Sequence, residues 1–272
     1  MQEIDNIYYG LCHELLFDSQ EVNGTSELNN VRVTIPDITK AIVSIRGISP
    51  SYLFGEALWY FTGRNDVKFI STFGSMWEKL SDDGKTNNSA YGYLMRYAFG
   101  FDQIEKVIKL LRKDPTSRRA VINLNTPNEN VIETKDEPCT IALQFLIRNE
   151  KLYCTGMMRS NDIWFGFPYD VAFFTQLQMY IADRLELKYG TYTHFVVSMH
   201  LYDRNIKDIQ KILENPVSRK ITFDRQKFWH DKEFVADLVE HSMNHYSKEY
   251  TRDLILDLAK DRFDFKEEED EG

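Results

Sequence analysis

The sequence has few cysteines, a shortage of basic side chains and no paired-cysteine motif. Its three cysteines, Cys12, Cys139 and Cys154, have no CxxC spacing, which argues against a disulfide framework and against a metal site. Lys and Arg total 33 against 42 Asp and Glu, for a formal net charge of -9. Because nucleic-acid backbones are bound through clustered basic side chains, we expect no stable nucleic-acid binding.

Membrane and targeting segments are also missing from the sequence. No apolar run reaches the roughly 20 residues that a membrane-spanning helix needs. The N-terminal MQEIDNIYYG has no basic segment followed by an apolar stretch, so we expect no signal peptide and a cytoplasmic protein. Apolar residues make up 43% of the 272 and aromatic residues 14%, enough for one sizeable core. We expect a single domain over 1–272, with a frayed acidic tail at 263–272.

Alternating helical and strand patterns predict an α+β fold with one large mixed β-sheet and flanking helices. Residues 170–187 are apolar on nearly every side, which predicts a buried central helix. Ser49 and Pro50 are typical of a helix start, and Gly63 of its end. A short polar link at 148–150 predicts a hairpin. The pattern predicts strands at 31–35, 41–45, 120–125, 140–147, 151–158 and 194–202, and further helices at 3–17, 51–63, 102–113, 205–215 and 231–263.

Cys139 is the first candidate for chemistry, since it lies in DEPCT just before a predicted strand. A cysteine acts as a nucleophile as the thiolate, which a nearby positive charge favours. Arg118 and Arg119 in DPTSRR and Arg159 in MRSND flank predicted strands and offer such a charge. Taken singly, the cysteine is also compatible with a small buried apolar residue. The arginines fit either solvated ion pairs or a phosphate clamp.

Three further polar residues stand out against apolar surroundings. Glu56 lies in the apolar segment FGEALWYF, where a carboxylate needs a buried partner or a functional role. His200 and Tyr202 are two apart on a predicted strand and therefore face the same side. They fit a half-buried core pair or a contact to a sugar hydroxyl. None of these residues decides a function alone.

Five blocks, in order, together carry a resemblance to a known family. They are GEALWYFTG (55–63), DPTSRR (114–119), EPCTIALQF (137–145), MRSNDIWFGFPYDVAFF (158–174) and HFVVSMHLY (194–202). In these blocks the chain resembles the thymidylate synthase family. The resemblance implies a thymidylate-synthase-like fold, a homodimer, and a reaction of a pyrimidine nucleotide with 5,10-methylenetetrahydrofolate as co-substrate.

The resemblance also implies roles for individual residues. Cys139 matches the nucleophile, Arg159 the arginine that contacts the phosphate and that sulfur, and Glu56 the carboxylate that orders water. Arg118 and Arg119 match arginines that bind the phosphate of the partner subunit. Arg32 matches the phosphate-binding loop, although the RTGTGT-like sequence of that loop is absent here. Trp77 and Asp162 match residues that contact the cofactor, and the residues that match nucleotide contacts are Ser160, Asn161, Gly166, His200, Tyr202 and Tyr91.

Asp170 departs from the pattern of family members that act on dUMP, which usually have Asn at this position. Uracil presents a donor at nitrogen 3 and an acceptor at oxygen 4, whereas cytosine presents an acceptor at nitrogen 3 and a donor amino group. An ionised Asp170 can accept from that amino group, and a protonated one can also donate to nitrogen 3. Facing uracil, an ionised carboxylate meets an oxygen with no hydrogen, a mispairing that costs about 1–3 kcal/mol when buried.

Three more departures accompany Asp170. Thr140 follows the cysteine where synthases usually have His, and Ser198 replaces an Asp of the HLY strand. The chain ends in DFKEEEDEG instead of an apolar tail that closes over the folate. At Thr140 and Ser198, and in its CT…QFLIR and MRSND motifs, the chain resembles the deoxycytidylate hydroxymethylases of T-even-type phages, and an acidic tail cannot seal an apolar site as the usual tail does. We therefore expect water to complete the reaction, giving 5-hydroxymethyl-dCMP and tetrahydrofolate from dCMP.

Other functions stay open at this stage. One is CMP 5-hydroxymethylation, as in nucleoside-antibiotic pathways, although Ser160 beside the sugar favours the deoxy form. Another is dUMP methylation, which Asp170 and the acidic tail disfavour. A third, from a different class, is a nucleotide- or RNA-binding regulator without turnover. The intact set of Cys139, Arg159 and Glu56 disfavours that third hypothesis.

Overall fold

The computed structural model describes residues 1–125, 131–219, 221–222, 231–263 and 266–267. Its main feature is one six-stranded sheet in the order β1-β2-β6-β5-β4-β3. β5 and β6 run parallel, and each other neighbouring pair in this sheet is antiparallel. The strands are β1 (Gln20–Glu21), β2 (Thr25–Ile35), β3 (Val121–Asn123), β4 (Thr140–Arg148), β5 (Lys151–Asp162) and β6 (Lys188–Tyr202). The predicted α+β fold with one large mixed sheet is confirmed.

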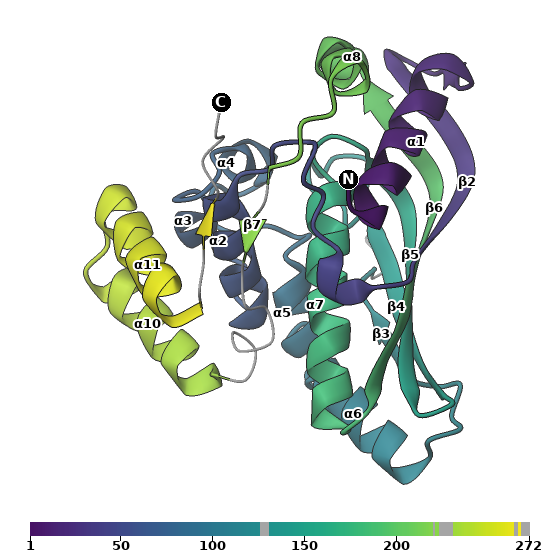
Figure 1. The fold of residues 1–272 in the computed structure, drawn as a ribbon. Coiled ribbons are helices and arrows are strands. Elements are labelled where there is room, and N and C mark those ends of the chain that lie inside the picture. The colour runs from purple at the N-terminus through teal and green to yellow at the C-terminus, as the bar shows by residue number, and fades with distance from the viewer. Residues whose placement is uncertain (126–130, 220, 223–230, 264–265, 268–272) are drawn as a thin grey trace.

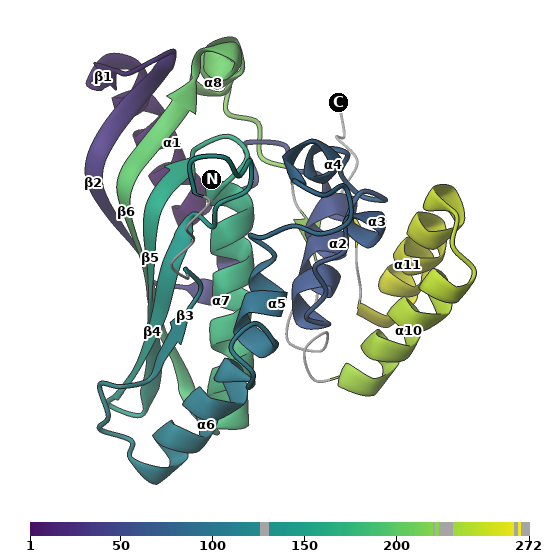
Figure 2. The ribbon, with the colours of Figure 1, turned by 180° about the vertical axis from the view of Figure 1, so that it is seen from behind.

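The helices are layered on one face of this sheet (Figures 1 and 2). α1 and α7 pack directly on the strands, α2 to α5 lie beyond α7, and the α10–α11 pair is outermost. In neither view does a described helix cover the opposite face. The helices are α1 (Glu3–Phe17), α2 (Pro50–Phe61), α3 (Val67–Ile70), α4 (Met76–Leu80), α5 (Tyr91–Arg96), α6 (Gln103–Lys113), α7 (Phe167–Arg184), α8 (Ile206–Glu214), α10 (Lys232–Asn244) and α11 (Lys248–Phe263), with short 3-10 turns at Ile38–Lys40 and Asp203–Asn205.

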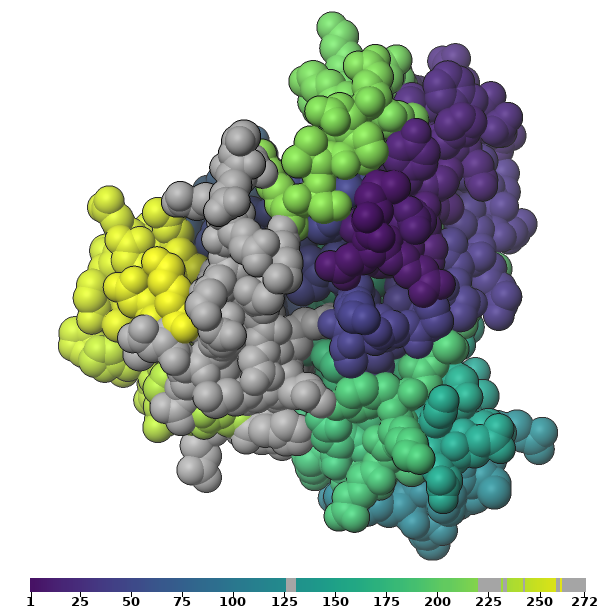
Figure 3. Space-filling view, in the orientation of Figure 1, coloured from purple at the N-terminus to yellow at the C-terminus, as the bar shows by residue number. Residues whose placement is uncertain are grey.

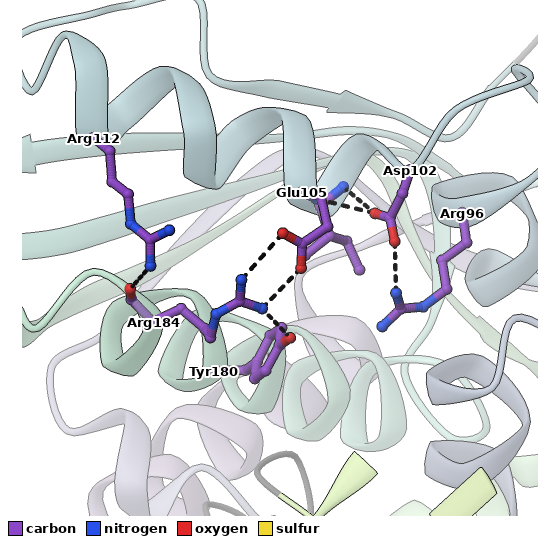
Figure 4. Close-up of polar contacts among 7 residues, drawn as sticks. Arg96, Asp102, Glu105, Arg112, Tyr180 and Arg184 are labelled. Carbon is purple, nitrogen blue, oxygen red and sulfur yellow. Dashed lines mark hydrogen bonds and ion pairs between the residues drawn. The ribbon is translucent and has the colours of Figure 1, made fainter. Parts of the chain in front are cut away.

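α7 is the predicted central helix, and its side chains are buried almost continuously from Phe167 to Ala182. Its far end is tied to α6 by polar contacts (Figure 4). Arg184 forms a two-pronged ion pair with Glu105, at 2.8 and 3.1 Å, and also donates to the Tyr180 hydroxyl at 2.6 Å. An apolar helix between sheet and outer helices gives the core its centre, and its first turn is left to face a cavity.

α2 begins and ends where the sequence predicts. The Ser49 hydroxyl accepts a hydrogen bond from the backbone N–H of Tyr52, Pro50 occupies the first turn, and Gly63 follows the helix with φ of +69°. α5 crosses α2 closely, since a Cβ at Gly92 would lie 2.0 Å from the carbonyl oxygen of Tyr60. This close crossing brings Tyr91, the first residue of α5, beside the C-terminal end of α2, where its ring stacks on that of Tyr60.

The predicted strand at 41–45 is wrong. Ala41, Val43 and Ile45 are buried at alternate positions, as in a strand, but Ser44 between the last two is buried as well. The backbone N–H groups of Ser44 and Ile45 instead donate to the carboxylate of Asp5 on α1, at 2.7 and 3.3 Å. A buried carboxylate therefore replaces the strand partner, and the segment is irregular backbone.

The hairpin at 148–150 is confirmed, with Asn149 and Glu150 both at positive φ, 49° and 60°.

At the N-terminus, α1 lies against α8, as the space-filling view shows (Figure 3). The Tyr9 hydroxyl donates to the carbonyl oxygen of Leu213 at 3.2 Å across that contact. The described helices include none that is long and apolar enough to cross a membrane.

The predicted C-terminal helical region is two helices, joined to the rest by polar contacts. Lys248 pairs with Glu78 of α4 at 2.6 Å, and the Tyr246 hydroxyl donates to the carbonyl oxygen of Lys68 at 3.0 Å. Most of the acidic tail, including 268–272, lies outside the described residues. Lys266–Glu267 form strand β8, paired with β7 (Ile221–Thr222), so a frayed tail is wrong for those two residues.

Candidate active site

A cavity of about 490 Å³ opens where the end of β5 and the start of β4 meet helices α2, α4, α5 and α7. Its size is that of a site for a small organic ligand. Twelve of the fifteen side chains predicted from the sequence line it: Glu56, Trp77, Tyr91, Cys139, Arg159, Ser160, Asn161, Asp162, Gly166, Asp170, His200 and Tyr202. Among the described residues, no group of three or more His, Cys, Asp or Glu is placed to hold a metal ion.

Arg159 binds the short segment that carries Cys139. The backbone N–H of Arg159 donates to the Cys139 carbonyl oxygen at 2.9 Å. Its Nε donates to the carbonyl oxygen of Pro138 at 3.0 Å, and its Nη2 to that of Glu137 at 2.8 Å. The same Nη2 lies 3.7 Å from the Cys139 sulfur. The end of β5 therefore holds both the position of the thiol and a positive charge beside it.

The Cys139 thiol has a pKa raised to about 11 by burial. The Arg159 guanidinium opposes this rise, whereas the nearby carboxylates of Asp170, Asp136 and Asp162 add to it. The thiol is therefore protonated near neutral pH. A bound group that excludes water and moves these carboxylates or their protons would change that balance, because the charges surround the sulfur at close range.

Glu56 is the centre of a hydrogen-bonded group on the α2 side of the cavity. The Tyr52 hydroxyl donates to its Oε1 at 2.7 Å, and the Tyr60 hydroxyl lies 3.5 Å from the same oxygen. Trp77 Nε1 donates in turn to the Tyr52 hydroxyl at 2.9 Å. Burial raises the pKa of Glu56 to about 8, and the charge of Asp170 adds to that rise. Such a carboxyl exchanges a proton near neutral pH, as a general acid or base must.

Asp170 lies in the first turn of α7 and faces the same cavity. Its Oδ2 accepts a hydrogen bond from Asn161 Nδ2 at 2.7 Å. Burial raises the pKa of Asp170 to about 7, with the Asn161 bond opposing the rise and the charge of Asp162 adding to it. The side chain is therefore divided between its ionised and neutral forms near neutral pH. It can offer either two acceptors or one donor and one acceptor.

The parallel pairing of β5 with β6 assembles the rim of the cavity. Asp162 is paired with His200, and Ser160 lies two residues before Asp162 on the same face of β5, so the ends of the two strands place three polar side chains together. The Ser160 hydroxyl lies 3.3 Å from Nδ1 of His200. Asp162 Oδ1 accepts from the backbone N–H of Trp164 at 2.8 Å, and burial raises the pKa of Asp162.

Three predicted phosphate ligands lie outside this cavity. Arg32 is exposed in β2, opposite Phe195 in the pairing with β6. Arg118 and Arg119 are exposed in the loop before β3, where Arg119 lies 4.0 Å from Asp114. Arg32 therefore does not line this cavity, and its match to the phosphate-binding loop stays a prediction.

Several lining residues were not found from the sequence. Tyr52 is one turn before Glu56 on α2, so helical spacing was the available signal. Arg204 stacks over the ring of Tyr202, 4.1 Å from its centre, and adds a cation at the rim. Asp136 accepts from the backbone N–H of Ser89 at 3.0 Å and so joins the loop before Cys139 to the loop before α5. No sequence pattern indicates these loop contacts.

The profile of the thymidylate synthase family matches residues 19–248. The chain belongs to the thymidylate synthase family. Among curated proteins, it is 34% identical over 185 residues to the deoxyuridylate hydroxymethyltransferase of Bacillus phage SP01, covering 61% of this chain and 48% of that protein. It is 30% identical over 185 residues to the deoxyuridylate hydroxymethyltransferase of Pseudomonas phage M6, covering 66% of this chain and 53% of that protein. The chain thus spans about half the length of these two relatives.

The residues that depart from the usual pattern of the family lie at different distances from the cavity. Thr140 is fully buried at the start of β4, directly after the thiol. Ser198 is half-buried and donates a hydrogen bond to Glu27 of β2, so it lies outside the cavity. Asp170 is the departure that faces the cavity itself. Of these three side chains, Asp170 is therefore the one that lines the cavity.

Replacing Arg159 tests the electrostatic coupling to the thiol. Arg159→Gln removes the cation that favours the thiolate, so the Cys139 pKa rises further and the rate of alkylation by iodoacetamide falls, by about tenfold near neutral pH. The rate is measured by mass spectrometry of the labelled chain, and Cys139→Ser identifies the site, since Cys12 and Cys154 are buried. Arg119→Gln is the matched control outside the cavity. An unchanged rate in Arg159→Gln would contradict the coupling.

Replacing Glu56 tests its raised pKa through folding stability. The folded pKa of about 8 lies above the ordinary 4.5, so folding takes up a proton between these values and stability is lost as pH rises through that window. Glu56→Gln removes this loss. Its free energy of unfolding should exceed that of the native chain by an amount that grows with pH, to about 2–4 kcal/mol near pH 8. Urea titrations at several pH values measure it, with the exposed Glu14→Gln as control. A pH-independent difference would show an ionised Glu56 in the folded chain.

Proposed function

We propose that this chain is a 5-hydroxymethylase of pyrimidine nucleoside monophosphates, with dCMP as its substrate. The reaction joins dCMP, 5,10-methylenetetrahydrofolate and water to give 5-hydroxymethyl-dCMP and tetrahydrofolate. Hydroxymethylation is supported by the names of the two phage relatives. It is also supported by Glu56, a buried carboxyl with a pKa of about 8 that can position and deprotonate water in the cavity.

The observation that carries the choice of cytosine is Asp170 in the cavity wall. With a pKa of about 7 it supplies both a donor and an acceptor when protonated. The nitrogen 3 and amino group of cytosine need those two partners, whereas the carboxamide usual in the family suits uracil. Asp170 lines the same cavity as Cys139, so a base whose carbon 6 faces the thiol can present its opposite edge to this carboxyl.

A folate fits the remaining wall of the cavity. Trp77, Leu80 and Met76 provide an apolar surface on α4, and Tyr169 adds a ring from α7. Asp162 supplies a carboxylate at the rim, suited to the N–H groups of a pterin ring. This combination of flat apolar contact and one buried acceptor supports 5,10-methylenetetrahydrofolate as the co-substrate.

In the proposed mechanism, the Cys139 thiolate adds to carbon 6 of the cytosine, with Arg159 favouring the ionised sulfur. Carbon 5 then forms a bond to the one-carbon unit of the co-substrate. Loss of the carbon 5 proton and departure of tetrahydrofolate leave an exocyclic methylene on the ring. Water beside Glu56 adds to that methylene, and the thiolate leaves as the ring regains its double bond.

A second candidate substrate is dUMP, because both phage relatives are named as deoxyuridylate hydroxymethyltransferases. A neutral Asp170 can also pair with uracil, by accepting from nitrogen 3 and donating to oxygen 4. The two candidates therefore differ in the order of donor and acceptor on the carboxyl. They share the chemistry of Cys139 and Glu56.

We further propose that the active form is a homodimer. The cations that line the cavity are Lys135, Arg159 and Arg204, while Arg118 and Arg119 are exposed at a distance from it. The sheet face without a covering helix exposes the apolar side chains of Ile141 and Val197. A second copy on this face would bury them, and its paired arginines are suited to complete the phosphate site.

The reaction is tested by product mass. The chain is incubated with 5,10-methylenetetrahydrofolate and, separately, with dCMP, CMP or dUMP, and the nucleotides are separated by mass spectrometry. We expect dCMP to gain one CH2O unit, with tetrahydrofolate and not dihydrofolate released, and Cys139→Ala to give no product. A gain of only CH2 would make the chain a methylase, and turnover of dUMP alone or CMP alone would overturn the choice of dCMP.

Asp170→Asn tests the residue proposed to recognise the base. A carboxamide offers uracil the donor and acceptor that it needs, so the ratio of kcat/KM for dCMP to that for dUMP should fall by at least about tenfold. Competition assays with both nucleotides measure the ratio directly. Asp136→Asn, a lining carboxyl on the opposite loop, is the control and should leave the ratio unchanged. An equal loss on both nucleotides in Asp170→Asn would remove Asp170 from base recognition.

A further inference from the structure

A chain of buried hydrogen bonds leads from the core to Asp170. The Tyr192 hydroxyl lies 2.9 Å from Nδ1 of His194, and Nε2 of His194 lies 3.1 Å from Oδ1 of Asn161. Nδ2 of Asn161 then donates to Oδ2 of Asp170 at 2.7 Å. Tyr192 and His194 are fully buried, and neither lines the cavity. Their hydrogen bonds to the site run through Asn161.

The chemistry of these groups allows only one direction of donation along this series of hydrogen bonds. The amide oxygen of Asn161 can only accept, so the hydrogen of a neutral imidazole must be on Nε2 of His194. Burial lowers the pKa of His194 to about 3, which keeps the imidazole neutral with a single N–H. Nδ1 is then an acceptor for the Tyr192 hydroxyl. Each group donates toward Asp170, and reversing one bond would leave a buried acceptor facing another acceptor.

Two glycines make room for this arrangement. A Cβ at Gly156 would lie 2.3 Å from the Tyr192 hydroxyl oxygen, and a Cβ at Gly166 would lie 2.5 Å from Asn161 Nδ2. The ring of Phe167 packs edge-on against His194, with centres 5.2 Å apart at 89°. The Tyr192 hydroxyl and Asn161 Nδ2 thus occupy space that a side chain at 156 or 166 would fill. The packing of Phe167 holds the imidazole in one orientation.

The direction of the chain has a consequence for Asp170. Because Asn161 presents hydrogens to Oδ2, that oxygen is an acceptor, and a proton on the carboxyl belongs on Oδ1. A carboxyl that is free to protonate either oxygen can pair with cytosine or with uracil, since the two bases present the same groups in opposite order. A carboxyl with an assigned donor and an assigned acceptor can match only one of them.

We propose that Tyr192 and His194 are positioning residues that set base specificity: through Asn161 they assign the acceptor and donor oxygens of Asp170, so that the cavity accepts one pyrimidine and rejects the other. This inference rests on the proposed function, in which Asp170 pairs with the base. It does not depend on which base is preferred, because the same assignment that admits cytosine in one orientation excludes uracil there.

His194→Phe tests the proposal by replacing the imidazole with a ring of similar size and no N–H. The Asn161 amide is then free to turn over, so the ratio of kcat/KM between the two bases should fall by at least about tenfold, through improved turnover of the disfavoured base. His194→Gln is the matched control, since its amide can donate to Asn161 and accept from Tyr192. Its ratio should stay within about threefold of that of the native chain. A ratio unchanged in His194→Phe, with both activities lowered equally, would leave these residues a structural role only and overturn the proposal.

Nitrogen-15 NMR of histidine-labelled native chain gives a second test that needs no turnover. The His194 imidazole should be neutral with its hydrogen on Nε2, and Tyr192→Phe should shift the Nδ1 resonance, because Nδ1 then loses its hydrogen-bond donor. Hydrogen on Nδ1 in the native chain would overturn the proposed direction.

The two proposals fail separately. If the native chain prefers dUMP, dCMP is refuted as the substrate, but the change in the base ratio still tests the positioning residues. If the native chain is equally active on both bases, the proposed assignment of donor and acceptor oxygens on Asp170 is refuted. If His194→Phe fails to fold, Tyr192→Phe takes its place in the ratio measurement.

Discussion

The contact between Arg159 and the backbone of 137–139 is the interaction on which the candidate site depends. One guanidinium binds two successive carbonyl oxygens and lies against the Cys139 sulfur, so the end of β5 and the loop before β4 form one unit. Without this contact, the loop that carries Cys139 would lose the hydrogen bonds from Arg159 that fix its position. The sheet contributes rigidity to this unit, because both segments continue directly into paired strands.

Burial gives the cavity its chemistry and also its instability. Glu56, Asp170 and Cys139 all have pKa values raised by desolvation, and the charge of Asp170 adds to the rise at both Glu56 and Cys139. Their proton affinities therefore fall in or near the range where transfer to a substrate or to water is possible. A cavity of this kind lowers the folding stability of the chain at alkaline pH, since three acidic groups would have to ionise out of water. Hydrogen bonds from Tyr52 and Asn161 offset part of that penalty.

Much of the fold followed from pattern, and its failures have physical causes. The buried helix α7, the hairpin at 148–150 and the start of α2 depend on periodicity, turn residues and capping, which are local in sequence. The segment 41–45 has the apolar alternation of a strand, yet its backbone donors bind Asp5, a partner 39 residues away. Arg32 lies outside the cavity for a similar reason, because strand pairing decides which face of the sheet its side chain occupies.

The sequence by itself determined the family, the thiol and its arginine, and the unusual carboxyl at position 170, because motif blocks and single departures are visible in one dimension. Only the tertiary structure decided how that carboxyl is held. Tyr192 and His194 lie on β6, Asn161 on β5 and Asp170 on α7, and the parallel pairing of the two strands beneath the helix brings them into one line. Hydrogen-bond direction depends on this juxtaposition of separate elements, which no spacing along the chain expresses.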